Sequence, residues 1–403
     1  MISLCGCGGG AIGGHRGAAP VLRVPARYRT IQAAVNASRA GELVLVAPGV
    51  YHQAVTVAVD HPRITIRGTD RNTVILDGGS DLVDGITVNA NGVSVENLTI
   101  RHYVVNGLVF APPETSAVTY GAPSPYLVGW RGSYVTAYDN GLYGVYSFNA
   151  RGGEFDHVYA SGNPDSGIYI GQCRSCDALV SDSIVADNGV GYEDTNASGG
   201  VTVTGIVSRE NRIGAFLDSA IKEAMPPQGY VTFAGNSVLD NDNAHAPTGD
   251  QGFAAGIVIS GGSHNLIAHN LVAGHRGAGI VVIDADRISG GYEALDNRVL
   301  DNHLAGNRVD LALLTSGATR GDCFSGNHPA RTVPANLQRR APCNSSRPLS
   351  GNMLTFPANP PQVDFAKLPA PPAQPDMPGP LTAPAGPAGA PAPIAPAEVR
   401  TPG

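Results

Sequence analysis

A glycine followed by alternating apolar residues recurs along the middle of the chain. One copy reads Gly144-Val145-Tyr146 and the next reads Gly167-Ile168-Tyr169-Ile170. Because successive side chains of a strand point to opposite faces, each copy predicts a short strand with one apolar face, preceded by a tight turn at the glycine. The copies are 22, 37, 23, 24, 23, 42 and 23 residues apart. They begin at Gly85, Gly107, Gly144, Gly167, Gly191, Gly214, Gly256 and Gly279.

A second marker, an asparagine at the end of a short β-like segment, runs in phase with the glycines. Asparagine tolerates left-handed backbone angles and bonds to neighbouring backbone, so it predicts a turn at this point of each repeat. Identical asparagine side chains that stack on one another can also form a hydrogen-bonded ladder. The marker residues are Asn140, Asn163, Asn188, Asn211, Asn241 and Asn302, with His275 in the same place in one repeat.

A repeat of about 23 residues with short strands and no helix predicts a β-solenoid. Leucine-rich repeats would show their leucine pattern, and propeller blades would need about 40 residues. Stacked coils lie about 4.8 Å apart, so each strand pairs in parallel one coil away and the inward residues form an apolar column. Residues 30–37 predict a helix that covers the open end, with Thr30 as its N-cap and Gly41 beyond its end. Residues 42–51 predict the first strand and turn.

The repeat pattern resembles the right-handed parallel β-helix family with the pectin-lyase-like fold. The resemblance covers roughly residues 30–330 and includes the opening helix with the string "APGVY" after it. It implies an all-β fold, a single right-handed parallel β-helix of about ten coils with an N-terminal capping helix. We therefore expect three parts: a Gly-rich segment over residues 1–27, the β-helix over residues 28–345, and a disordered Pro/Ala-rich tail over residues 346–403.

The composition agrees with a β-rich protein that has many turns. The 403 residues include 52 Gly and 31 Pro, while charged residues are only 15% of the chain, which excludes a coiled coil or helical bundle. A hydrophobic share of 42% excludes a charge-driven disordered chain. A net charge of −7 argues against a general nucleic-acid binder, which needs a basic face. No apolar run reaches the length of about 18 residues that a membrane helix needs.

The first residues resemble a bacterial lipobox, Leu4-Cys5-Gly6-Cys7, which would place a lipid on Cys7. Only three residues precede Leu4, whereas a signal peptide has a basic region and 7–15 apolar residues before its cleavage site. We expect either a start placed too late or a fortuitous Gly-Cys run.

Four further cysteines predict two disulfides. Cys173 and Cys176 form a Cys-x-x-Cys motif, and Cys323 and Cys343 lie roughly 30 Å farther along the solenoid axis, too far to complete one zinc site. A thioredoxin-type motif would open a helix, which this segment does not predict. We expect a small disulfide at Cys173–Cys176, with buried thiols as the alternative, and a second disulfide that ties the tail to the body. These pairs favour an oxidising compartment.

Aligned strands predict a row of aromatic and acidic side chains on the outer face of the solenoid. Aromatic rings pack on the C–H faces of sugars, and carboxylates take their hydroxyls. Glu193 and Asp218 lie on adjacent coils and are the candidate catalytic pair of a glycoside-cleaving site. The alternative is that loops at 111–127 and 220–230 fold over the row and bury it. The expected substrate-binding residues are Tyr146, Phe148, Asp165, Tyr169, Gln172, Asn196 and Phe216.

A second acidic column, Asp139, Asp187, Glu210 and Asp301, precedes the turn asparagines. Like charges stacked one strand apart repel unless a cation intervenes, so calcium is the one cofactor that the sequence suggests. Asp-Asn is also a common turn dipeptide, and we favour this structural interpretation.

Enzymes of the resembled fold provide motifs for comparison. Tyr143 and Gly144 match the start of the Tyr-Gly-x-Asp-Pro-His-Asp/Glu strand of mannuronan C5-epimerases. The Asp, Pro, His and acidic positions of that motif are Tyr146, Ser147, Phe148 and Asn149, so the groups for proton transfer at C5 are missing. Polygalacturonase signatures are absent, and the arginines form no recognisable pectate-lyase arrangement. Residues 164–176 and 191–200 resemble an actinobacterial subgroup of β-helix proteins without established activity.

We predict an extracytoplasmic protein, secreted or in the cell envelope, that binds or modifies a polysaccharide in a lyase- or hydrolase-like way. The expected partner is a polysaccharide or envelope glycan, not nucleic acid, and the expected state is a monomer attached to membranes only through an N-terminal lipid. The alternative is a non-catalytic, envelope-anchored structural or interaction scaffold. A resemblance to β-helix proteins that assist copper-site maturation has little support, because the chain has 4 Met and no histidine cluster.

Overall fold

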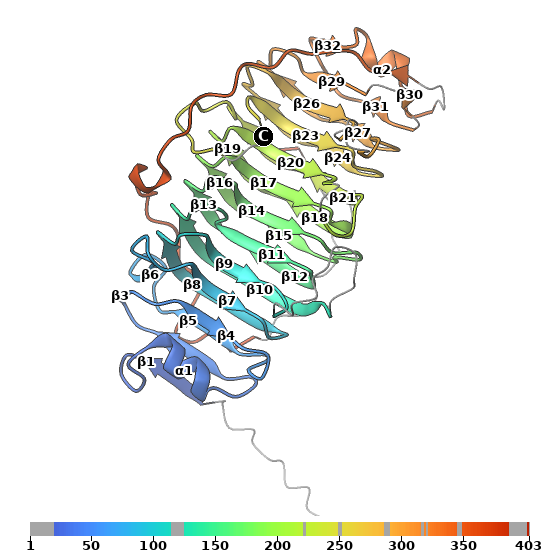
Figure 1. Cartoon of the computed structure of the whole chain (residues 1–403). Coiled ribbons are helices and arrows are strands. Elements are labelled where there is room, and N and C mark those ends of the chain that lie inside the picture. Colours follow the sequence, from blue (N-terminus) through green and yellow to red (C-terminus); the bar gives the residue numbers. More distant parts are fainter. Residues whose placement is uncertain are drawn as a thin grey trace, which may run out of the picture.

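The chain folds into a right-handed parallel β-helix, shown by a computed structural model (Figure 1). The coils stack from the N-terminal helix α1 (Ile31–Ala37) to the C-terminal helix α2 (Leu337–Arg340). Thr30 caps α1, because its side chain accepts a hydrogen bond of 3.1 Å from the Ala33 amide. The predicted solenoid and capping helix are confirmed. The structure describes residues 20–113, 125–220, 223–248, 252–285, 291–315, 318–319, 321–344, 349–386 and 401–402.

One face of the solenoid is an 11-stranded parallel sheet to which each coil contributes one strand. The eleven strands agree with the expected number of about ten coils. In chain order they are β4 (Val55–Val57), β7 (Asp84–Val88), β9 (Asn106–Phe110), β11 (Val145–Phe148), β14 (Ser166–Gly171), β17 (Val190–Thr195), β20 (Ile213–Asp218), β23 (Ala255–Ser260), β26 (Ala278–Ile283), β29 (Leu311–Leu313) and β32 (Thr332–Val333).

The remaining faces form a 20-stranded parallel sheet that bends around the solenoid. A small antiparallel pair, β30 (Ala318–Thr319) and β33 (Leu349–Ser350), lies near the C-terminal end. The strands of the large sheet are β1 (Val21–Val24), β2 (Leu43–Val46), β3 (Gly49–Tyr51), β5 (Thr65–Gly68), β6 (Val74–Asp77), β8 (Val93–Arg101), β10 (Leu127–Tyr138), β12 (Ala150–Asp156), β13 (Tyr159–Ser161), β15 (Leu179–Ser181), β16 (Ile184–Ala186), β18 (Ser198–Thr204), β19 (Val207–Arg209), β21 (Gly229–Ala234), β22 (Ser237–Leu239), β24 (Leu266–Ala268), β25 (Leu271–Ala273), β27 (Arg298–Leu300), β28 (His303–Ala305) and β31 (Cys323–Ser325).

The core is a set of columns that run along the solenoid axis. Each column takes one residue from the same register position of successive strands, and the side chains are buried. Burial of such apolar surface contributes about 25 cal/mol per Å², which makes these columns the main stabilising feature of the fold. One column of the 11-stranded sheet consists of Ile86, Leu108, Val145, Ile168, Tyr192, Ala215, Ile257, Ile280 and Leu311.

A buried acid interrupts the neighbouring core column, which the alternating pattern did not reveal. Asp194 lies in register between Ile170 and Leu217 and accepts a hydrogen bond of 3.1 Å from the Tyr192 hydroxyl. Burial raises the pKa of Asp194 to about 8. At neutral pH this carboxyl is therefore mostly protonated, which lowers the cost of its place among apolar side chains.

The repeated glycines are required by close packing between coils, which differs from the tight turn expected from the sequence. At Gly191 a Cβ atom would lie 2.6 Å from the Gly214 carbonyl oxygen and 2.8 Å from Asn211 Nδ2. The left-handed turn conformation instead falls on the residue before each asparagine, as at Asp187 with a φ of 57° and Glu210 with a φ of 55°.

The predicted asparagine ladder is present and buried from Asn140 to Asn241, but Asn302 does not belong to it. Asn302 lies in a second ladder with Asn236, Asn270 and Asn327, at the preceding turn of each coil. Asn188 donates to Asn211 Oδ1 from both its backbone amide (2.9 Å) and its side chain (3.0 Å), and Asn163 donates to Asn188 in the same way. The side-chain amide of Asn188 also donates to the carbonyl oxygens of Ala160 and Ala186, each at 3.0 Å. The ladder thus satisfies the backbone groups of every turn that it passes.

His275 continues the ladder as a neutral imidazole. Its Nδ1 lies 2.8 Å from Asn307 Oδ1, and its Nε2 lies 3.3 Å from Asn241 Nδ2. Nδ1 therefore carries the proton and donates to Asn307, and Nε2 accepts a hydrogen bond from the side-chain amide of Asn241. Burial lowers the pKa of His275, although the hydrogen bond to Asn307 and the carboxylates of Asp242 and Asp240 act in the opposite direction.

This pKa predicts acid sensitivity of the fold. The unfolded chain takes up a proton on this histidine below pH 6.5, whereas the folded chain resists it, so the free energy of unfolding decreases as the pH falls below 6.5. We expect a slope of at most about 1.4 kcal/mol per pH unit from this group. Urea unfolding of the wild type and His275→Asn between pH 7 and 5 measures it, since Asn keeps a ladder residue and cannot titrate. Equal pH profiles of the two proteins would refute the assignment.

Both predicted disulfides are present, Cys173–Cys176 and Cys323–Cys343. Cys7, the candidate lipidation site, lies outside the described residues. No helix within the described ranges is long and apolar enough to cross a membrane.

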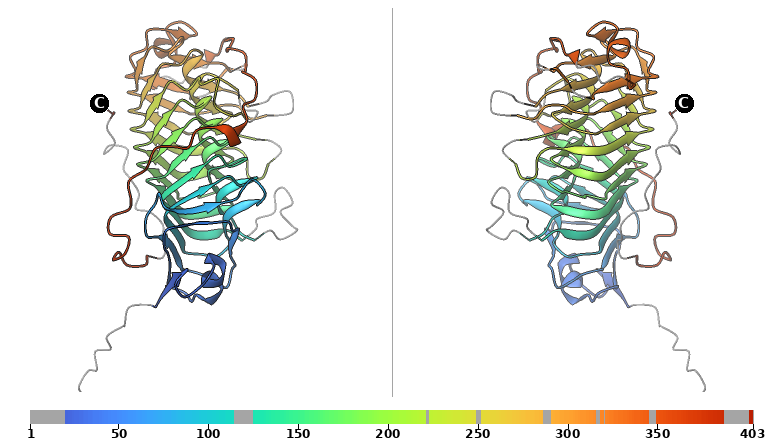
Figure 2. Two further views of the ribbon diagram at one scale, coloured as in Figure 1. Left: turned by 90° about the vertical axis from the view of Figure 1, so that its left-hand side faces the viewer. Right: turned by 90° about the vertical axis from the view of Figure 1, so that its right-hand side faces the viewer.

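The described residues 349–386 of the C-terminal segment contain little regular structure. Its described part nevertheless lies against the body instead of extending free into solvent. From Gly351 it follows the outside of the solenoid back toward the N-terminal coils (Figure 2), with one 3-10 turn, η2 (Phe365–Lys367). Hydrogen bonds from Arg212, Arg71 and Arg67 to this segment explain the difference.

Candidate functional site

The predicted row lies on the outer face of the 11-stranded sheet. Tyr146, Tyr169, Glu193 and Phe216 occupy the same register position of β11, β14, β17 and β20. The inward neighbours of these residues are the core column described above, so the alternation of the strands turns the row outward. The predicted register of the four residues is therefore confirmed.

Four rings gather at the N-terminal end of this row. Tyr146 stacks on Tyr169 with ring centroids 4.9 Å apart and on Phe148 at 5.6 Å. Tyr143 completes the cluster, at 4.8 Å from Tyr146 and 4.7 Å from Tyr169. The sequence analysis compared Tyr143 only with the epimerase motif, because this residue precedes the strand and does not follow its alternation. Burial raises the pKa of all three tyrosines, so their hydroxyls stay protonated at neutral pH.

Glu193 and Asp165 form a close acidic pair beside these rings. Thr195 Oγ1 donates to Glu193 Oε1 at 2.9 Å, and Glu193 Oε2 has no donor among the described groups. Burial raises the pKa of Glu193 well above its ordinary value, and the charge of the Asp165 carboxyl and a hydrogen bond with it raise the pKa further. Two carboxyls that share a hydrogen bond need a proton between them, so the pair favours protonation of one of the two.

Asp218 lies diagonally across from Glu193, because its register partners are Thr195 and Ser260. Burial raises the pKa of Asp218, while hydrogen bonds from the Ser260 side chain and the Ser219 amide lower it part of the way. The charge of Asp218 acts only weakly on Glu193, as the last of the causes that raise its pKa. The two predicted catalytic carboxyls thus share one surface and are not in direct contact.

Gln172 and Asn196, two of the predicted substrate-binding residues, hold a loop. Gln172 Nε2 donates to Glu223 at 2.6 Å, and its Oε1 accepts from the Ala224 amide at 3.1 Å. Asn196 exchanges two hydrogen bonds with the backbone of Ala220, at 2.8 and 3.0 Å. Both amides are therefore engaged with the segment after β20.

This loop adds an acid that the sequence analysis missed. Glu223 is half-buried, burial raises its pKa, and its charge acts on Tyr143, Tyr146 and Tyr169. It lies outside the repeat and therefore has no periodic signal. Among the described residues, no lysine or arginine forms an ion pair with Glu193, Asp218 or Glu223. No cationic side chain therefore offsets the effect of burial, which raises the pKa of these carboxyls.

The row is partly covered. This result lies between an open sugar-binding row and a row that loops bury completely, the two alternatives expected from the sequence. Tyr169 is 3% exposed and Glu193 is 6% exposed, whereas Tyr146, Phe148 and Phe216 are half-buried. The loop at 220–230 contributes to this cover, as the contacts of Glu223 show. The other predicted cover, the loop at 111–127, lies largely outside the described residues.

The second acidic column belongs to the turns, and the prediction is wrong for Asp301. Asp139, Asp187 and Glu210 stand before strands of the 11-stranded sheet, whereas Asp301 stands at another turn, between β27 and β28. Asp139, Asp187, Glu210 and Asp301 have φ angles of 53°, 57°, 55° and 52° directly before the buried asparagines. Burial raises the pKa of Asp139 to about 8, and Asp187 accepts a hydrogen bond of 3.0 Å from Asn243. Within the described ranges, no three His, Cys, Asp or Glu side chains come together in a way that can hold a metal ion.

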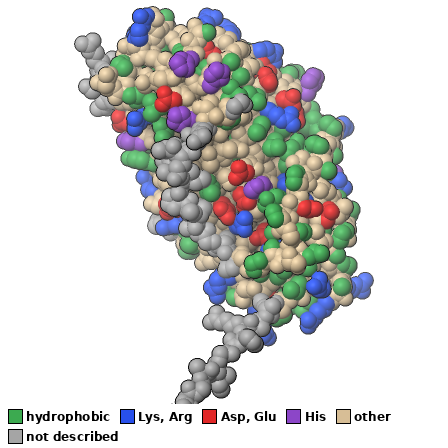
Figure 3. All heavy atoms as spheres, turned by 180° about the vertical axis from the view of Figure 1, so that it is seen from behind, with side chains coloured by type: hydrophobic (Ala, Val, Ile, Leu, Met, Phe, Trp, Pro, Cys, Tyr) green, Lys and Arg blue, Asp and Glu red, His purple; other side chains and the backbone are tan. Residues whose placement is uncertain are grey.

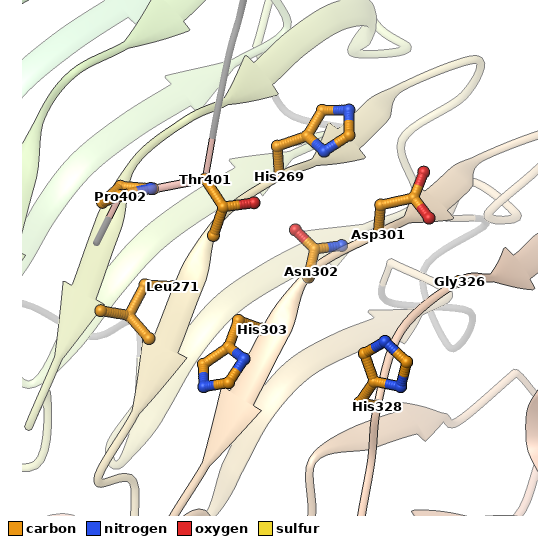
Figure 4. Close-up of a pocket in the computed structure, with 9 residues that line it drawn as sticks. All are labelled: His269, Leu271, Asp301, Asn302, His303, Gly326, His328, Thr401 and Pro402. Carbon is orange, nitrogen blue, oxygen red and sulfur yellow. The ribbon is translucent and has the colours of Figure 1, made fainter.

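Histidines gather toward the upper end of the opposite face (Figure 3). Three of them, His269, His303 and His328, line a hollow of about 670 Å³ together with Asp301 (Figure 4). Their rings stand apart on successive coils and do not point toward one position. This hollow has no aromatic ring other than imidazole, so the row on the 11-stranded sheet is the better candidate for a sugar site.

Residues 127–327 match the sequence model of a family described as a right handed beta helix region. Together with the parallel sheets, this match shows that the chain is a right-handed parallel β-helix protein. No curated protein matches the chain.

Solved structures with the same fold include two bacterial enzymes and a phage protein. The A-modules of the mannuronan C-5 epimerases AlgE6 and AlgE4 of Azotobacter vinelandii are each 15% identical, with TM-scores of 0.52 and 0.50. These matches cover 75% of this chain and 92% and 94% of the two modules. The enzymatically active domain of tailspike protein 2 of bacteriophage CBA120 is 13% identical, with a TM-score of 0.51, over 73% of this chain and 44% of that chain. At these identities the likeness shows the shared fold alone.

Proposed function

We propose that the protein is an extracytoplasmic carbohydrate-binding or polysaccharide-modifying β-helix protein, lyase- or hydrolase-like, that acts through the outer row. The observation that carries this proposal is the cluster of stacked rings beside buried carboxyls whose pKa values are raised by burial. Stacked rings offer flat apolar faces for sugar C–H groups, and carboxyls bond to hydroxyls. The relatives named above that act on mannuronan share the fold, which agrees with this class of substrate.

The carboxyls suit acid–base chemistry on a glycosidic bond. Burial and the neighbouring Asp165 carboxyl raise the pKa of Glu193 and so favour its protonated form, and Glu193 is the proposed general acid, which protonates the leaving oxygen. Asp218, separated from it by one diagonal of the sheet, is the proposed base or nucleophile. Diagonal neighbours on a sheet have their Cβ atoms about 7–8 Å apart or slightly less, a spacing from which two side chains can reach the carboxyl separation of roughly 5–9.5 Å found in glycoside hydrolases.

A scaffold without catalysis is the second candidate, and the burial of Tyr169 and Glu193 favours it. In this alternative the rings and the loop at 220–230 form a small additional core, and the β-helix serves as a rigid interaction surface. The two disulfides agree with an extracytoplasmic location in either case.

A binding screen against a panel of polysaccharides distinguishes these candidates. We expect the wild type to bind at least one of them and Tyr146→Ala to weaken that binding by about fivefold, since a stacked ring contributes about 1 kcal/mol beyond its area. Tyr230→Ala is the control, because Tyr230 is 55% exposed on the other sheet. Absence of binding to every polysaccharide, or equal losses in both variants, would favour the scaffold.

A further inference from the structure

Three buried arginines fasten the C-terminal segment to the body. Arg212, Arg71 and Arg67 are 0%, 2% and 1% exposed, although arginine is seldom buried without partners. Arg212 donates to the carbonyl oxygens of Pro360 and Pro361, at 2.9 and 2.8 Å. The coil that contains Arg212 is five coils away from the coil that contains Arg67 and Arg71. The segment is therefore held at two distant points of the solenoid.

The second point of attachment repeats the same chemistry. Arg71 Nη1 donates to the Pro375 carbonyl oxygen at 3.2 Å. Arg67 donates to the carbonyl oxygens of Ala383 and Pro384, at 2.7 and 2.9 Å. All three arginines therefore donate to backbone carbonyl oxygens of the segment, and Arg212 Nη1 donates in addition to Asn359 Oδ1 at 3.0 Å.

Guanidinium groups and proline-rich backbone are complementary in hydrogen bonding. An arginine side chain has five N–H donors and no acceptor, and a proline has a carbonyl acceptor and no N–H donor. Residues 359–386 include nine prolines. A chain of this composition is already extended before it binds, so docking costs less conformational entropy than for an ordinary loop.

Two backbone N–H groups of the segment donate to the body as well. The Gln374 amide donates to Asn72 Oδ1 at 2.8 Å, and Asn72 Nδ2 donates back to the Gln374 carbonyl oxygen at 2.9 Å. The Met377 amide donates to Asn97 Oδ1 at 2.8 Å. The body thus presents acceptors where the segment has donors, and donors where it has acceptors.

The arginines are held in place by the body itself. Arg67 Nε bonds to Glu96 at 2.7 Å. Arg71 donates to the Thr136 hydroxyl at 2.8 Å and to the Val135 carbonyl oxygen at 2.9 Å, and Arg212 donates to the Ala246 carbonyl oxygen at 2.8 Å. Their remaining donors point outward, which is the arrangement of a preformed site.

We propose that this surface is a recognition site for an extended proline-rich peptide, and that its ligand is residues 359–386 of this chain. The site is separate from the aromatic row, and the proposal does not depend on the proposed function. Phe356 and Leu354 lead the segment onto the surface by packing on the small apolar cluster at the C-terminal coils.

Cleavage of the folded full chain tests the attachment. Met353 is 91% exposed, so a protease recognition sequence inserted there can be cut without disturbing the body. We expect the cut segment to co-elute with the body in gel filtration, and to separate from it in the Arg67→Ala, Arg71→Ala, Arg212→Ala triple variant. Arg340→Ala, an exposed arginine of α2, is the matched control and should retain the segment. Separation in the wild type, or retention in the folded triple variant, would overturn the proposal.

A labelled peptide of residues 371–386 tests recognition in trans on the same cut protein. We expect it to displace the cut segment and to bind at least tenfold more tightly than a scrambled peptide of equal composition. Equal binding of both peptides, or of neither, would contradict a recognition site. Hydrogen exchange in the uncut triple variant adds a readout that needs no cleavage: the amides of Gln374 and Met377 should lose protection while the strands keep theirs.

Discussion

Replacing Asn188 by alanine is expected to lower the free energy of unfolding by about 3–5 kcal/mol, a large part of the net stability of a domain. The side chain makes three donor contacts and accepts two hydrogen bonds, all buried. Its removal leaves the backbone amide of Asn163 and two carbonyl oxygens without partners, and each such group costs about 1–3 kcal/mol. Urea unfolding followed by circular dichroism measures the loss.

The loss of stability on replacing a ladder asparagine should depend on its position along the ladder. Asn140 lies at the end of the ladder and donates to Asn163 over longer distances, 3.2 and 3.3 Å, so Asn140→Ala should cost less than Asn188→Ala. Asn352→Ala, at an exposed asparagine, should stay within about 0.5 kcal/mol of the wild type. If Asn188→Ala also stayed within this range, the ladder would not be a main source of stability.

Replacing Glu193 by glutamine is expected to reduce polysaccharide turnover by about 10²–10⁴-fold with little loss of binding. Glutamine has the same shape and can bond to Asp165, but it cannot transfer a proton. Because burial and Asp165 raise the pKa of Glu193, the wild-type rate should fall as the pH rises through that pKa, since the acid is then lost. Measurement of reducing ends or unsaturated products over a range of pH provides the test.

Glu210→Gln is the control for this variant, because its carboxyl belongs to the turn between β19 and β20 and pairs with Arg209. It should leave both the rate and the pH profile unchanged. An unchanged rate in Glu193→Gln would remove this residue from the chemistry, and a lost rate accompanied by lost binding would indicate a role in binding alone.

Those features that recur once per coil were predictable from the sequence. The register of Tyr146, Tyr169, Glu193 and Phe216 follows from counting residues after each glycine, because parallel coils repeat the same geometry. His275 was placed among the ladder asparagines on the same basis. The physical role of the glycines was not predictable, since the close approach of the next coil is a contact between residues about 23 positions apart.

Features outside the repeat required the structure. Tyr143 and Glu223 join the site from a turn and a loop, where alternation gives no direction. The C-terminal segment has the composition of a disordered chain, and its contacts with the body, among them those with buried arginines of distant coils, do not show in the sequence pattern. Asp194 belongs to a strand whose pattern predicts an apolar residue at that position.

The central claim is that a polysaccharide lies across the row on the 11-stranded sheet, and side-chain footprinting tests it most directly. Hydroxyl-radical oxidation of the protein, with and without the polysaccharide found in the screen, reports the exposure of each aromatic ring. The account predicts that binding protects Tyr146, Phe148 and Phe216, while oxidation of Tyr230 on the other sheet stays the same. Protection of Tyr230 with no change in the three rings of the row would contradict it.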